Sequence, residues 1–183
     1  MSSRFSPGRA PIGDVGAALL LIDSRIKGFQ SERPEMDPEQ HRLIDQFLRS
    51  FDSEGANDVL DGACTLIYLY VEWLRQAHEH LERDVIEYVL PYVVGTMRMM
   101  TRSIEPETIP TMAGMMVAAA IGVSPTLWRR QYGPWLRAEL IALEATVFLL
   151  ADHINHITED PDAATRLITD LLNAVTEDLP RSD

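Results

Sequence analysis

The feature that most constrains the fold is a stripe of branched apolar residues whose spacing alternates between four and three. Its members are Leu136, Leu140, Leu143, Val147, Leu150, Ile154 and Ile157. Residues at this spacing share one face of an α-helix, whereas a strand would place them on both faces of a sheet. Ile141 and Phe148 widen the stripe beyond the narrow seam of a two-stranded coiled coil. The stripe therefore predicts an interior helix of a bundle.

The same helical period occurs elsewhere in the chain. Apolar residues recur at steps of three and four through residues 60–81 and again through residues 85–100. Pro91 falls inside the second run and predicts a kink or break, because proline lacks the backbone N–H and clashes with the preceding turn. Four residues are typical helix N-caps: Asp37, Asn57, Ser124 and Asp160.

The chain lacks the strand pattern in which polar and apolar residues alternate between hairpin turns. With 183 residues, of which 46% are hydrophobic, it is long and apolar enough to bury one sizeable core. We therefore predict an all-α fold, a single-domain helical bundle of about six or seven helices. The helical domain is expected to span residues 14–180, after a flexible N-terminal arm of residues 1–13.

Helices are also predicted near both ends of the domain. One begins near Asp14 and carries Leu19 and Ile22, and the other runs from Asp162 to Leu179. The second helix is amphipathic, so we expect it to pack on its own fold or on another copy of the chain. The latter arrangement would make the protein a homodimeric structural or interaction protein, which is one alternative for its function.

Two features bear on location. Cys64 is the one cysteine and lies in an apolar run, so no intramolecular disulfide can form and a cytoplasmic location is expected. Residues 109–128 carry no charge, but their strongly apolar part is only residues 112–123, bracketed by prolines. A stretch of about 10 to 14 apolar residues is typical of a buried core helix, so no membrane span is predicted.

The net charge of -12 is unevenly distributed. Residues 88–138 carry five basic and two acidic side chains, so the acidic excess lies in the two flanks. A protein that binds nucleic acid over its whole surface needs clustered Lys and Arg, so no nucleic-acid partner is expected. The middle segment is the one part of the chain equipped to bind an anionic group.

Methionine is concentrated in the same middle segment, where six of the eight occur within 20 residues. Methionine is unbranched and adaptable, so it either fills gaps in a core or lines a deformable apolar groove. We predict a non-catalytic binding or regulatory module whose groove takes a hydrophobic small molecule, an anionic one included, or a partner helix. The candidate binding residues are Met97, Arg98, Met100, Arg102, Met112, Met115, Met116, Trp128 and Arg129.

Histidines and carboxylates form the alternative candidate site. His78 with Glu82, and His153 with His156, are spaced to share a helix face, so each pair could present two metal ligands. Two ligands do not make a site, and the Glu-x-x-His motif of carboxylate-bridged di-iron bundles is absent. No cofactor or metal is therefore predicted. An enzyme remains the second alternative, metal-dependent or acting on a hydrophobic substrate, if these groups converge in three dimensions.

Residues 118–130 contain a Gly-Val-Ser turn followed by Thr126, Leu127 and Trp128. This stretch locally resembles the turn and recognition helix of TetR-type repressors, which would imply DNA binding. Its spacing is one residue shorter than that pattern, and it lies past mid-chain, whereas the family keeps it near the N-terminus. We therefore interpret it as a turn between two core helices, capped by Ser124, with Trp128 packed inside.

Overall fold

The computed structural model describes residues 15–23, 53–79 and 83–177, and all regular structure in these ranges is helical. The helices are the segment 15–23, α3 (Ser53–Glu79), α4 (Val85–Met99), α5 (Ile109–Ala120), α6 (Pro125–Arg130), α7 (Arg137–Thr158) and α8 (Ala163–Glu177). A short 3-10 turn, η1 (Pro106–Thr108), precedes α5. The predicted all-α bundle of six or seven helices is confirmed.

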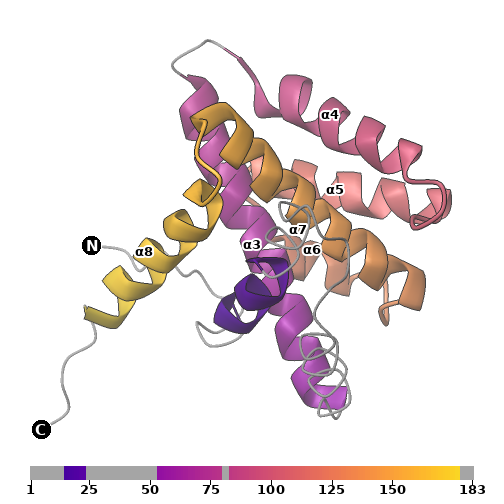
Figure 1. The fold of residues 1–183 in the computed structure, drawn as a ribbon. Helices are drawn as coiled ribbons and strands as arrows, with labels where there is room; N and C mark the ends of the chain where they lie inside the picture. Colours follow the sequence, from indigo (N-terminus) through magenta and orange to yellow (C-terminus); the bar gives the residue numbers. More distant parts are fainter. Residues whose placement is uncertain (1–14, 24–52, 80–82, 178–183) are drawn as a thin grey trace, which may run out of the picture.

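Helices α3 and α7 run through the middle of the bundle (Figure 1). Helix α3 packs against α7 and α5, and α4 lies along an outer edge on α5 and α7. The short helix α6 closes the space between α5 and α3. Helix α8 packs on the C-terminal part of α7 and extends to the side of the bundle (Figure 1).

The core is built from the facing stripes of α3 and α7. Leu66 and Leu74 of α3 are fully buried, as are Leu150 and Ile154 of α7. The predicted stripe of α7 is therefore correct over its middle, but its ends are solvent-exposed, with Leu136 at 65%. Amphipathic spacing identifies one helix face, and the extent of the covering helices decides how much of that face is buried.

The structure differs from the sequence-based expectation at two positions, a predicted cap at Asn57 and a predicted kink or break at Pro91, where no break occurs. Asn57 lies inside α3, which begins at Ser53. Pro91 lies inside α4 without ending it, and the chain instead breaks before α4, where the Asp84 carboxylate accepts a hydrogen bond of 2.8 Å from the Ile86 N–H. Pro91 is exposed, so water can satisfy the backbone carbonyl that proline leaves without a partner.

Other predictions about helix ends agree with the structure. Ser124 caps α6 by accepting a hydrogen bond from the Leu127 N–H at 3.4 Å. Residues 15–23 form the expected early helix, with Leu19 and Ile22 buried. The expected arm of residues 1–13, the cap at Asp37 and the candidate ligand Glu82 lie outside the described residues.

The charge-free segment forms α5 and α6, and six of the twelve residues of α5 are buried, as expected for a core helix. Among the described helices, α7 is long and apolar enough to cross a membrane by length and composition alone. In this fold 56% of its most apolar stretch is buried against the other helices.

Candidate functional site

The methionine-rich segments lie on two helices that pack against each other, α4 and α5. Their side chains do not form an open methionine-lined groove, since the four buried ones are at most 3% exposed: Met97, Met112, Met115 and Met116. The hydroxyl of Thr146 on α7 donates to the Ala142 carbonyl oxygen at 2.7 Å and lies 3.6 Å from the Met97 sulfur, so α4 packs directly on the central helix there. Most of these methionines thus contribute to the core.

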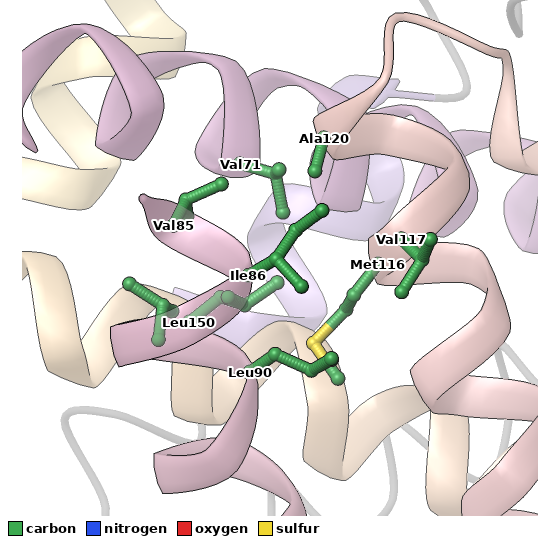
Figure 2. Close-up of a pocket in the computed structure, with 9 residues that line it drawn as sticks. Val71, Val85, Ile86, Leu90, Met116, Val117, Ala120 and Leu150 are labelled. Atoms are coloured by element: carbon green, nitrogen blue, oxygen red, sulfur yellow. The ribbon is translucent and has the colours of Figure 1, made fainter. Parts of the chain in front are cut away.

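A small apolar pocket lies between α4 and the helices beneath it, α3, α5 and α7 (Figure 2). Its empty space amounts to about 220 Å³ when the adjoining solvent is counted, but only about 10 Å³ is free between the lining side chains. Across it the thioether of Met116 points toward Leu90 (Figure 2). Every lining side chain is apolar: Val71, Val85, Ile86, Val89, Leu90, Met116, Val117, Ala120 and Leu150.

Of the nine candidate binding residues, only Met116 lines this pocket. Arg98 and Arg102 are exposed, and Met100 is half-buried. Arg98 lies in the last turn of α4 and Arg102 in the turn that follows it, while the pocket is under the N-terminal half of the helix. Leu90 and Arg98 are eight residues apart, which is about 12 Å along a helix.

Trp128 and Arg129 on α6 belong to a separate cluster under the turn that leads to α7. The Trp128 ring packs on Tyr132, with centroids 4.7 Å apart. Arg129 is buried and pairs with Glu139, Nη2 to Oε2 at 2.5 Å, with its guanidinium 4.3 Å from the Trp135 ring. The partners of Arg129 thus come from its own chain.

The structure brings two of the candidate histidines together. The rings of His78 on α3 and His153 on α7 stack with centroids 6.4 Å apart and planes 19° from parallel. Tyr92 of α4 covers His153, with ring centroids 4.9 Å apart. His156 is exposed on the same helix and takes no part in the stack.

The protonation of this cluster follows from its hydrogen bonds and burial. His78 Nδ1 donates to the Leu74 carbonyl oxygen at 2.8 Å, and His153 Nε2 is buried with no partner among the described residues. Burial, followed by the neighbouring His78 and His156, lowers the pKa of His153 below its ordinary value. The cluster favours a neutral imidazole at His153.

The described residues show neither a metal site beside the His78–His153 stack nor a reactive nucleophile. Within the described ranges, no three His, Cys, Asp or Glu side chains are placed to hold a metal ion. Cys64 is fully buried, and burial together with the nearby Asp61 carboxylate raises the pKa of its thiol to about 12. A thiol with that pKa is protonated at neutral pH and is a poor nucleophile.

The pocket could not be found by examining any one segment of the sequence. Val71, Leu90 and Leu150 come from three different helices and have the same spacing as ordinary core residues. Met116 is the one lining residue that the sequence predicts as a binding residue, and that prediction depends only on the local abundance of methionine. Comparison of the chain with protein-family models, with curated proteins and with solved structures found no match.

Proposed function

We propose that this protein is a non-catalytic binding module that holds an apolar ligand, or the apolar part of one, between α4 and α5. The observation that carries the proposal is the pocket under α4, whose nine lining side chains are all apolar. Burying a ligand methylene group there contributes about 0.8 kcal/mol. Binding would therefore be driven by the hydrophobic effect and not by hydrogen bonds from the lining.

The size of the pocket restricts the ligand. Pockets for drug-sized molecules enclose about 300 to 1,000 Å³, whereas the space left free between these lining side chains is about 10 Å³, enough for about one water molecule. The end of an alkyl chain or a single small ring therefore fits only when the lining side chains move aside. The three rotatable bonds of Met116 let it adjust to ligands of different shape, as methionine does at adaptable binding surfaces.

The charge of the ligand is a separate question. A carboxylate on a chain inserted under the N-terminal half of α4 would have to reach along the helix to Arg98, since no lining residue is charged. An uncharged chain avoids the cost of desolvating that carboxylate. We therefore expect decanol to bind more tightly than decanoate.

Thermal unfolding with each compound tests the proposal. A ligand that binds only the folded state adds about 2.7 kcal/mol to the free energy of unfolding at a hundred times its Kd, and so raises the melting temperature with concentration. Decanol should do so, and Ala120→Leu, which fills the pocket, should remove the effect. Ala174→Leu makes the same change at an exposed position on α8 and should leave the effect intact.

Two results would count against the proposal. Decanol could leave the melting temperature unchanged, or it could stabilise Ala120→Leu as much as the unaltered chain. A larger shift with decanoate than with decanol would instead favour the anionic ligand that the basic middle segment suggests.

A further inference from the structure

The outer face of α4 carries apolar side chains that the bundle leaves partly in solvent, although one of them, Tyr92, also contacts the His153 ring. Tyr88 is 46% exposed, Tyr92 41% and Met99 76%. They are four and seven residues apart, so they form one stripe, which lies beside the buried face that carries Val89 and Val93. Figure 1 shows α4 at an edge of the bundle, with its inner side against α5 and α7.

A glycine lies on the same stripe. Gly95 follows Tyr92 by three residues in the interior of α4, where glycine costs about 0.5 to 1 kcal/mol relative to alanine. A Cβ atom at Gly95 would meet no other atom within 4 Å, so no packing in the described part of the chain requires a glycine there. The missing side chain at Gly95 leaves a gap in the stripe, and another helix can approach the backbone of α4 closely at this gap.

Two opposite charges flank the stripe at its two ends. Glu87 lies in the first turn of α4 and Arg98 in the last turn, and both are exposed. Eleven residues separate them, which is close to three full helical turns, so they lie on the same side of the stripe. Neither forms an ion pair with any described residue.

We propose that this face binds a second copy of the chain, with the two α4 helices antiparallel about a two-fold axis between residues 92 and 93. The axis brings Glu87 level with Arg98 of the partner subunit, and symmetry repeats the pair at the other end. Tyr88 then lies in the gap over Gly95 of the partner subunit. A parallel pair would instead bring equal charges together, which is unfavourable.

Three separate features thus agree on one axis: the charges, the position of the glycine and the apolar stripe. The helix at residues 162–179 was the dimer contact expected from sequence. In the structure the apolar side of α8 packs on its own core through Ala164 and Ile168, so the contact proposed here uses α4 instead. A contact made by one 15-residue helix is small, so the dimer is a concentration-dependent one.

Sedimentation velocity over a concentration series tests the contact. The unaltered chain should pass from monomer to dimer as concentration rises. Glu87→Arg and Arg98→Glu should each raise the dissociation constant about tenfold, because each replaces two symmetric ion pairs by two repulsions. The double variant E87R/R98E should dimerise like the unaltered chain, since it restores both pairs with their signs exchanged.

Two further variants separate this contact from a general effect of charge or folding. Gly95→Leu fills the gap without a clash at its Cβ atom, so it should prevent dimerisation without lowering the melting temperature of the monomer. Asp170→Arg reverses an exposed charge on α8 and should not change the dissociation constant. A chain that stays monomeric throughout, or a double variant that fails to recover, would overturn the proposal.

Discussion

Arg129 and Glu139 form an ion pair that is buried at the junction of α6 and α7, with Nη2 and Oε2 2.5 Å apart. Arg129 also donates to the Gly133 carbonyl oxygen at 2.9 Å, and Glu139 accepts from the Leu136 N–H at 2.8 Å. The pair therefore holds both ends of the turn between the two helices. Its residues serve the fold, although Arg129 was expected from sequence to face a ligand.

Replacing Arg129 by methionine should lower the free energy of unfolding by about 3 to 5 kcal/mol, because it leaves the Glu139 carboxylate buried without its counter-ion. Urea unfolding followed by circular dichroism measures the change. The matched control is Arg130→Met, which breaks the pair between Arg130 and Asp61. That arginine is largely exposed, so its loss should cost at most about 1 kcal/mol. Equal losses in the two variants would contradict this account.

Gly114 on α5 lies directly against the Trp128 ring. A Cβ atom at Gly114 would be 2.4 Å from Cη2 of that ring, well inside van der Waals contact. Gly114→Ala should therefore destabilise the fold by about 1 to 3 kcal/mol, as overpacked cores do. Gly95→Ala, at a helical glycine with open space, should stabilise it by about 0.5 to 1 kcal/mol.

The same unfolding experiment can confirm that the ring is the cause. Adding Trp128→Leu to Gly114→Ala removes the clash, so the double variant should lose less stability than the sum of the two single losses. Strict additivity would show that the glycine is needed for another reason.

The parts of this fold that the sequence predicted are those decided by local chemistry. The cap at Ser124 depends on a hydroxyl and an N–H three residues apart, and such a contact can be read from adjacent positions. The pairing of Arg129 with Glu139 could not be anticipated, because it depends on the turn through Gly133, whose φ is 81°. The pocket was likewise hidden, since Val71 and Leu150 meet only through tertiary packing.

Two methionines separate core packing from surface exposure. Met112 on α5 is fully buried, so Met112→Ala should lower the free energy of unfolding by about 2 to 5 kcal/mol. Met99→Ala changes a side chain that is 76% exposed and should stay within about 0.5 kcal/mol in the monomer. Denaturant unfolding of both variants measures the difference. Similar values would mean that Met112 is not part of the close-packed core.

His153 should make the fold less stable as the pH falls below its ordinary pKa of 6.5. Its pKa is lowered in the folded state, mainly by burial, so the unfolded chain takes up the proton first and is favoured as pH falls. The groups around the ring include His78, Tyr92, Asp152 and His156, and among these charges Asp152 opposes the shift. Melting temperatures measured between about pH 7 and pH 5 should therefore fall, and the fall should be smaller in His153→Gln.

His156→Gln is the control for this pH dependence, because it removes an exposed imidazole one turn away on the same helix. It should retain most of the fall in melting temperature that the unaltered chain shows. The stacked pair explains the difference: a proton on His153 would place positive charge next to His78 and on a buried nitrogen that no described residue solvates. A fall that persists in His153→Gln and disappears in His156→Gln would show that the exposed ring, not the stacked one, couples protons to folding.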